Sequence, residues 1–175
     1  MKTIQAPLKR EDIMKLTAGE PVLVNGTVYT ARDAAHQRMA AAIRAGEMLP
    51  FDPQGQVIYY TAPSPAPPQR VIGSAGPTTS GRMDIYTPLL IERGLRVTIG
   101  KGERDQAVKE AMRQYGAVYL ATVGGAGAYL ARRIVSATVV AYPELGPEAV
   151  YRLEVRDFPC TVAIDAWGND IYQRQ

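Results

Sequence analysis

Cysteine and histidine are nearly absent from this chain of 175 residues, which contains one of each, Cys160 and His36. A single cysteine excludes an internal disulfide, and it excludes an iron–sulfur cluster held by this chain alone, because such clusters need several thiolates. One histidine and one cysteine also leave no ligand set that encloses zinc, so we expect no metal site here. Cys160 lies in a strand-like context, where we expect a small, buried, apolar residue.

Long apolar runs and runs of basic residues are missing as well. No stretch approaches the roughly 18 consecutive apolar residues that a membrane helix needs, and charged residues interrupt the N-terminal segment where a signal peptide has its apolar core. The net charge is only +3, and the basic residues are dispersed among acidic ones. This pattern argues against a nucleic-acid-binding surface. The sequence therefore predicts a cytoplasmic protein that binds neither membrane nor nucleic acid.

The composition is typical of a folded domain, with 46% hydrophobic and 21% charged residues. A chain of this length is sufficient to bury a substantial core. We expect a single domain over residues 1–175, with a proline-rich loop at 62–69 within it, because proline cannot continue in the interior of a sheet. A linker between two domains is the alternative interpretation of that loop.

Hydrophobic periodicity predicts alternating strands and helices. Strands are expected at 57–60, 95–99, 118–122, 137–141, 151–155 and 161–165, with Val71 and Ile72 as a further strand-like piece. Helices are expected at 82–91, where Pro88 shortens or kinks the helix, and at 105–115 and 126–133. Alternation of this kind favours parallel β-α units. The sequence therefore predicts an α/β fold with a mixed sheet and helices.

Near the N-terminus, the pattern predicts a hairpin followed by a helix. Asn25-Gly26 separates two strand-like triplets and supplies the positive φ angles of a two-residue turn. Thr30 and Asp33 then resemble a capping box, apolar residues recur at helical spacing, and Gly46 ends the run.

The most informative part of the sequence is Gly76-Pro77-Thr78-Thr79-Ser80-Gly81-Arg82-Met83-Asp84. Glycine lets the backbone approach a ligand closely, and arginine grips a planar carboxylate through two parallel hydrogen bonds. Together with threonine hydroxyls and free backbone N–H groups, these residues predict a site for a carboxylate or a phosphate. The alternative is a capped helix start with Ser80 as the N-cap.

Two further basic segments stand at element junctions. Thr30-Ala31-Arg32-Asp33-Ala34-Ala35-His36 opens the first helix, and Ile99-Gly100-Lys101-Gly102 closes a strand. Arg32 and Lys101 are therefore placed to meet Arg82, with a solvated arginine and an ordinary turn lysine as the alternatives. The run at 124–128 lacks the spacing of a nucleotide-phosphate loop and is expected to pack a strand against a helix.

These segments are followed by Tyr142-Pro143-Glu144-Leu145-Gly146-Pro147-Glu148-Ala149 and Asp157-Phe158-Pro159, and their order resembles the iron–sulfur class I fumarases. The chain is similar to the C-terminal domain of those enzymes, or to the separate β subunit of two-subunit fumarases and L-tartrate dehydratases. The resemblance runs from about Val22 to Tyr172. It implies a swivelling β/β/α-type domain.

The resemblance also implies that this chain is half of an active site. In the family, a 4Fe–4S cluster on another subunit or domain binds the substrate hydroxyl, so we expect a cysteine-bearing α subunit that carries the cofactor. Arg32, Thr78, Arg82 and Lys101 match the positions that bind the dicarboxylate substrate. Thr78 and Lys101 are the candidate catalytic residues. The Thr78 hydroxyl is the candidate for proton transfer once a carboxylate activates it.

Three neighbours are candidate supporting residues: Asp33 as a helix cap or a group that orients Arg32, His36 as a hydrogen-bonded structural histidine or a pH switch, and Thr79. The expected activity is fumarate hydratase, which interconverts malate with fumarate and water, and L-tartrate dehydratase is the second possibility. A stand-alone anion-binding module and a structural or regulatory subunit are alternatives of other classes. An apolar face covered by the α subunit would also allow the isolated chain to form a homodimer.

Overall fold

The computed structural model describes residues 1–173, and within them seven strands form one sheet in the order β1-β2-β3-β4-β5-β7-β6. The strands are β1 (Lys2–Ala6), β2 (Pro21–Thr30), β3 (Val57–Tyr59), β4 (Val97–Gly100), β5 (Val118–Ala121), β6 (Ile134–Ala141) and β7 (Val150–Ile164). Strands β2 to β5 pair in parallel, each with the next. Their carboxyl ends therefore lie along the same edge of the sheet.

The long strand β7 closes this sheet on itself. It pairs antiparallel with β5 through its C-terminal part and antiparallel with β2 along most of its length. The pairings therefore form a closed circuit of β2, β3, β4, β5 and β7, and β1 and β6 extend it on the outside. The predicted α/β class with a mixed sheet is confirmed, while the swivelling β/β/α type and the single-domain organisation stay predictions.

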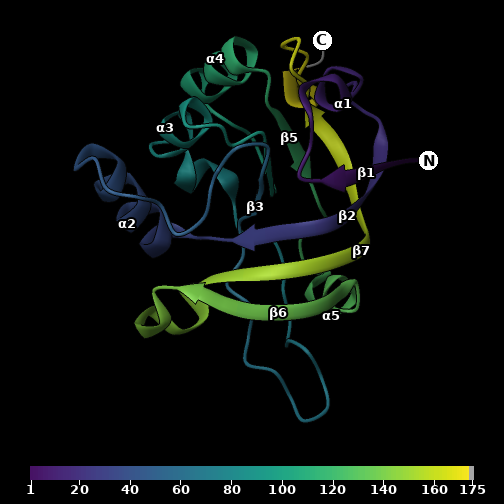
Figure 1. Cartoon of the computed structure of the whole chain (residues 1–175). Coiled ribbons are helices and arrows are strands. Elements are labelled where there is room, and N and C mark those ends of the chain that lie inside the picture. Colours follow the sequence, from purple (N-terminus) through teal and green to yellow (C-terminus); the bar gives the residue numbers. More distant parts are fainter. Residues whose placement is uncertain (174–175) are drawn as a thin grey trace.

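Helices α2, α3 and α4 group together beside the strands, on the left and upper left of Figure 1. The α-helices are α1 (Arg10–Met14), α2 (Asp33–Arg44), α3 (Thr87–Glu92), α4 (Gln106–Tyr115) and α5 (Gly127–Ala131). Short 3-10 helices are η1 (Ser80–Met83), η2 (Pro143–Glu148) and η3 (Ile171–Gln173). In the described part of the chain, no helix is long and apolar enough to cross a membrane.

The strands have apolar residues on both faces because they separate two packed regions. In β3, Val57 and Tyr59 point into the interior enclosed by the strands, whereas Ile58 packs against α2 and α3. In β5, Val118 and Leu120 occupy the same interior, whereas Tyr119 packs against α4. This period-2 alternation with both faces buried is typical of parallel strands covered by helices.

The predicted hairpin at Asn25-Gly26 is wrong, because both residues lie within the continuous strand β2. The ladder between β2 and β7 shifts register there, which is a bulge rather than a turn. Gly26 has a φ of +101°, and a Cβ at this position would overlap the carbonyl oxygen of Ala6 on β1. The Asn25 amide exchanges hydrogen bonds with Asp157, donating to its Oδ1 and accepting from its backbone N–H. A close strand approach therefore requires the glycine.

Several predicted boundaries also differ from the structure. The expected helix at 82–91 is divided into η1 and α3, with Pro88 in the first turn of α3, where a missing N–H does no harm. Val71 and Ile72 belong to the irregular segment that contains the proline-rich loop 62–69, which extends away from the strands at the bottom of Figure 1. The strands expected at 151–155 and 161–165 are one strand, β7, in which Asp157 adopts a φ of 52°.

The helix expected after Thr30 is present, but the predicted capping box is wrong. Arg32, not Thr30, is the N-cap of α2. The Thr30 hydroxyl instead joins the sheet, accepting from the N–H of Tyr151 at 3.1 Å and donating to the carbonyl of Ala149 at 3.5 Å. A partner distant in the sequence has therefore displaced the local one.

Candidate functional site

The candidate site lies along the carboxyl edge of the parallel strands. Arg32 follows β2 and Lys101 follows β4, with β3 between them. Two strand spacings separate these positions by roughly 10 Å. The loop that precedes η1 returns to the same edge, where the N–H of Thr78 donates to the carbonyl of Tyr60 at 2.7 Å, just after β3. Parallel α/β sheets commonly bind ligands at this edge.

The loop at 76–84 is held in place by its own backbone groups. The N–H of Ser80 donates to the carbonyl of Lys101 at 2.9 Å, and Thr79 and Lys101 form an isolated parallel bridge. The Thr61 hydroxyl donates to the carbonyl of Gly76 at 2.7 Å. Ser80 is not the N-cap of a helix, because its hydroxyl bonds the buried Tyr119 hydroxyl at 2.8 Å. The N–H groups of Thr78 and Ser80 are therefore used within the chain, and the groups of this loop that remain for a ligand are mainly side chains.

Arg82 and Asp33 form an ion pair that joins η1 to the start of α2. Asp33 was expected to cap the helix or to orient Arg32, but its Oδ2 accepts instead from the guanidinium of Arg82. Both side chains are half exposed, so the pair lies at the rim of the site. A guanidinium has five N–H donors, so Arg82 keeps donors for a ligand carboxylate while Asp33 holds it.

Three buried polar atoms around the start of α2 have no hydrogen-bond partner within residues 1–173: Arg32 Nε, Asp33 Oδ1 and His36 Nε2. Buried polar atoms are normally paired, since an unpaired one costs on the order of 1–3 kcal/mol. Unpaired donor and acceptor atoms at the carboxyl edge are consistent with a site that a ligand or a partner completes.

Lys101 and Thr79 are exposed, and Thr78 is half buried. Lys101 forms no ion pair with any carboxylate in the described part of the chain, so its ammonium is available to an anion. It lies beside Gly124, where a Cβ would be 3.3 Å from Nζ. The glycine-rich run thus leaves room for Lys101. At the start of α5, a Cβ on Gly127 would overlap the Ser74 hydroxyl, so Gly127 lies close to the loop. Leu130 of the same helix packs into the core formed by the strands, as expected.

His36 is fully buried and structurally bonded, in agreement with the first of its two expected roles. Its Nδ1 lies 2.8 Å from the carbonyl of Arg32, so Nδ1 carries the proton in the neutral ring. The ring packs against Tyr60 and Tyr86. Burial lowers the pKa of His36 to about 4, with a further contribution from Arg104 and with Asp33 and the Arg32 carbonyl opposing the shift. The ring is therefore neutral near pH 7.

This depressed pKa predicts acid destabilisation. Between about pH 6.5 and pH 4, the unfolded chain binds a proton at His36 that the folded chain excludes, so stability is complete above that range and falls as pH falls. The full difference corresponds to about 3 kcal/mol. Urea unfolding of the wild type and of His36→Gln from pH 7.5 to pH 4 should show a steeper loss in the wild type. Parallel pH profiles would contradict the assignment.

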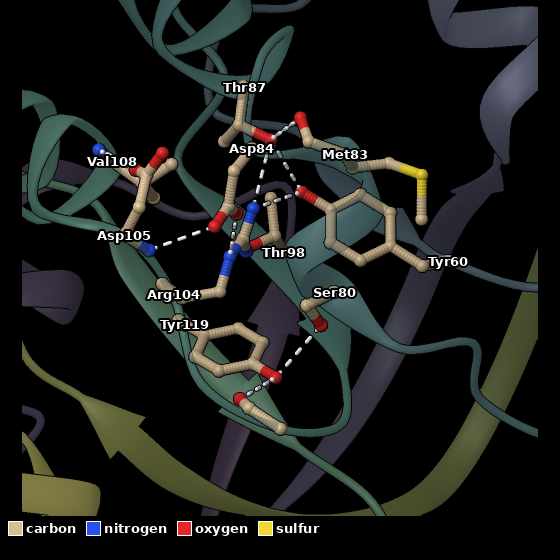
Figure 2. Close-up of polar contacts among 11 residues, drawn as sticks. Tyr60, Ser80, Met83, Asp84, Thr87, Thr98, Arg104, Asp105, Val108 and Tyr119 are labelled. Atoms are coloured by element: carbon tan, nitrogen blue, oxygen red, sulfur yellow. Dashed lines mark hydrogen bonds and ion pairs between the residues drawn. The ribbon is translucent and has the colours of Figure 1, made fainter.

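Sequence reasoning missed Arg104, whose side chain is completely buried beneath the site. Figure 2 shows its guanidinium near the rings of Tyr60 and Tyr119 and against the carboxylate of Asp84. The Nε atom donates to Asp84 Oδ1 at 2.7 Å. In the sequence, Arg104 is a charged residue in a polar loop, and only its position three residues after Lys101 connects it with the site.

Comparison with known proteins identifies the family of this chain. The family model described as Fumarase C-terminus matches residues 2–175. The chain is 40% identical over 167 residues to "Fumarate hydratase 2" of Leishmania major, covering 94% of this chain and 29% of that protein. It is 41% identical over 153 residues to "Fumarate hydratase class I, anaerobic" of Escherichia coli, covering 86% and 28%.

A relative of similar length is the Methanocaldococcus jannaschii protein named "Putative L(+)-tartrate dehydratase subunit beta". The identity is 39% over 172 residues, covering 95% of this chain and 88% of that protein. The chain thus spans less than a third of the two fumarate hydratases and most of the β-subunit relative. The segments that suggested class I fumarases all lie within the matched residues. The expected resemblance is confirmed, and this chain belongs to the Fumarase C-terminus family.

Proposed function

We propose that this chain is the β subunit of a two-subunit 4Fe–4S hydro-lyase that hydrates fumarate to malate and catalyses the reverse reaction. The observation that carries the proposal is the position of Arg32, Thr78, Arg82 and Lys101 at one edge of the sheet, next to unpaired buried atoms of Arg32 and Asp33. The names of the relatives "Fumarate hydratase 2" and "Fumarate hydratase class I, anaerobic" support this reaction.

Arg32, Arg82 and Lys101 are proposed to bind the carboxylates of the substrate. In the dehydration direction, a proton leaves the carbon next to one carboxylate, which places further negative charge on that group in the transition state. Fixed cations stabilise this charge more strongly than they stabilise the ground state. The Thr78 hydroxyl is proposed to contact the substrate and to pass the proton to a carboxylate of the partner, because a threonine hydroxyl alone is a weak base.

The residues of this chain do not fit a 4Fe–4S cluster. Cys160 is buried, and burial raises the pKa of its thiol, which disfavours the thiolate that a metal requires. Within residues 1–173, His, Cys, Asp and Glu side chains form no group of three or more that could hold a metal ion. We therefore propose that the cluster belongs to a cysteine-bearing α subunit, and that this chain binds and orients the dicarboxylate.

L-Tartrate dehydration is the second candidate reaction. The chain covers 88% of the relative named as a tartrate dehydratase β subunit, whereas it covers 29% of the Leishmania fumarate hydratase. Tartrate and malate differ by one hydroxyl, so the same carboxylate-binding side chains serve either substrate. A pocket that hydrogen-bonds the extra hydroxyl would discriminate between them strongly.

Anaerobic turnover of malate, fumarate and L-tartrate tests the proposal, measured with the chain alone and after co-expression with a cysteine-bearing α subunit from the same source. Activity only in the co-expressed sample would support a shared active site, and the preferred substrate would distinguish the two reactions. If both samples are inactive while the α subunit carries a complete cluster, the proposal is wrong for these substrates. Dicarboxylate binding by the isolated chain would then favour an anion-binding module.

A further inference from the structure

Arg104 is the centre of a buried polar network that includes Tyr60, Asp84 and Thr87 (Figure 2). Besides its bond to Asp84, its guanidinium donates to Thr98 Oγ1 at 3.1 Å, to the Tyr60 hydroxyl at 3.0 Å and to Thr87 Oγ1 at 2.9 Å. The edge of the guanidinium is thus surrounded by acceptors from separate elements. Its planar, forked geometry fixes all of them at once, which lysine cannot do.

Aromatic rings cover the guanidinium as well. Its carbon lies 5.1 Å from the ring centre of Tyr60 and 4.9 Å from that of Tyr119. Burial alone would lower the pKa of Arg104, but the nearby Tyr60 and Asp84 outweigh burial and raise it, so the charge is retained. Cation–π contacts of this kind gain strength where water is excluded.

Each tyrosine connects Arg104 to a candidate binding loop. The backbone carbonyl of Tyr60 accepts from the N–H of Thr78, so the position of the Tyr60 ring is linked to that of Thr78. The Tyr119 hydroxyl donates to the carbonyl of Gly102 at 2.8 Å and bonds the Ser80 hydroxyl, which joins the Lys101 loop to the Arg82 turn.

Asp84 provides the third connection, because it closes the turn that carries Arg82. Its N–H donates to the carbonyl of Gly81, and its Oδ2 accepts from the N–H of Asp105 at 2.8 Å. A single buried carboxylate therefore contacts Arg104 and the start of α4 while it ends the Arg82 turn.

A buried ion pair is weak evidence for stability, because well-packed apolar residues often replace such a pair without loss. We propose that Arg104 is a positioning residue that fixes the loops carrying Thr78, Arg82 and Lys101 relative to one another. The inference rests on the proposed function only insofar as those side chains bind a substrate. The rigid arrangement of the loops is testable without turnover.

Hydrogen exchange in the full chain is the first test, comparing the wild type with Arg104→Met. The amides of Thr78 and Ser80 should exchange at least roughly tenfold faster in the variant than the global change in stability accounts for. The matched control is Lys109→Met, which breaks the ion pair with Asp170 away from the site. The two ion pairs are similarly buried: the side chains of Lys109 and Asp170 are 11% and 5% exposed, and those of Arg104 and Asp84 are 0% and 8% exposed. If amide exchange instead becomes faster by the same factor throughout the chain in both variants, Arg104 does not have the positioning role.

Turnover with the cluster-bearing α subunit is the second test. Arg104→Lys, which retains the charge, should raise KM for the dicarboxylate and lower kcat/KM by about tenfold, whereas Lys109→Met should behave like the wild type.

A milder variant is available for the exchange test if Arg104→Met does not fold. Tyr119→Phe removes only the hydroxyl that bonds Gly102 and Ser80, and it should produce the same exchange pattern. An inactive wild-type complex would contradict the proposed function alone, since the exchange result still decides the positioning role. Wild-type KM in Arg104→Lys together with normal loop exchange would overturn the inference.

Discussion

Replacing Arg82 with alanine is expected to lower kcat/KM for the dicarboxylate on the order of a hundredfold in the complex with the α subunit. The pair in question is the proposed one between Arg82 and a substrate carboxylate. Removing one partner of a desolvated, hydrogen-bonded charge pair costs about 2–5 kcal/mol, and a loss of about 3 kcal/mol gives a hundredfold change. Arg82→Lys should be intermediate, because lysine keeps the charge but loses the two-pronged geometry. Steady-state kinetics with fumarate and malate measure both effects.

Arg38→Ala is a matched control for this experiment. Arg38 lies on α2 itself and pairs with a carboxylate outside this helix, Glu144 of η2, at 2.6 Å. Its side chain and that of Glu144 are 46% and 56% exposed, close to the 50% and 40% of Arg82 and Asp33. An exposed pair of this kind is screened by solvent and contributes little, so Arg38→Ala should have nearly normal turnover. Near-normal turnover in Arg82→Ala would instead favour a structural or regulatory subunit.

The sequence predicts those parts of the candidate site whose signals lie within a few residues of each other. Arg32, Arg82 and Lys101 stand next to glycines or at element boundaries, and parallel strands bring their carboxyl ends to one edge. The helix at 105–115 was also predictable, because Asp105 caps it with a side-chain bond to the N–H of Val108. Local signals of this kind do not depend on the rest of the fold.

Errors arose where a distant partner overrides a local signal. Asn25-Gly26 has the composition of a hairpin turn, but β1 and β7 lie on either side of it and require a bulged strand. Thr30 has the composition of a cap, but it bonds Ala149 and Tyr151. The pairing of β2 with β7 brings together residues more than a hundred positions apart, and no local window contains that information.

Arg104 was missed for a different physical reason. Arginine is almost never fully buried unless it is paired, so a charged residue in a polar loop is expected to be solvated. Its burial requires Asp84, Tyr60 and Tyr119 to converge from separate elements. Each of these residues is unremarkable in the sequence, and only the tertiary structure shows that they surround a single guanidinium.

Replacing Gly100 with alanine should destabilise the chain by about 3 kcal/mol, the upper part of the range for overpacking a core. Gly100 ends β4, and a Cβ there would overlap the Ser80 hydroxyl and lie 2.9 Å from a ring carbon of Tyr60 and 3.2 Å from the carbonyl oxygen of Thr78. Urea unfolding of the chain alone measures this effect. Gly81→Ala is the control, since the nearest atom to its Cβ is 3.8 Å away.

The overlap at Gly100 also predicts how the loss can be reversed. The Ser80 hydroxyl cannot swing aside without breaking its bond to Tyr119, so the clash is transmitted to the loops carrying Thr78 and Lys101. Removing that hydroxyl in Ser80→Ala should cost about 1 kcal/mol alone. In the double variant, Ser80→Ala should restore part of the stability lost in Gly100→Ala, because residues in contact are coupled. Additive losses would show that the clash is relieved elsewhere, and that the Gly100 contact does not set the spacing of the two loops.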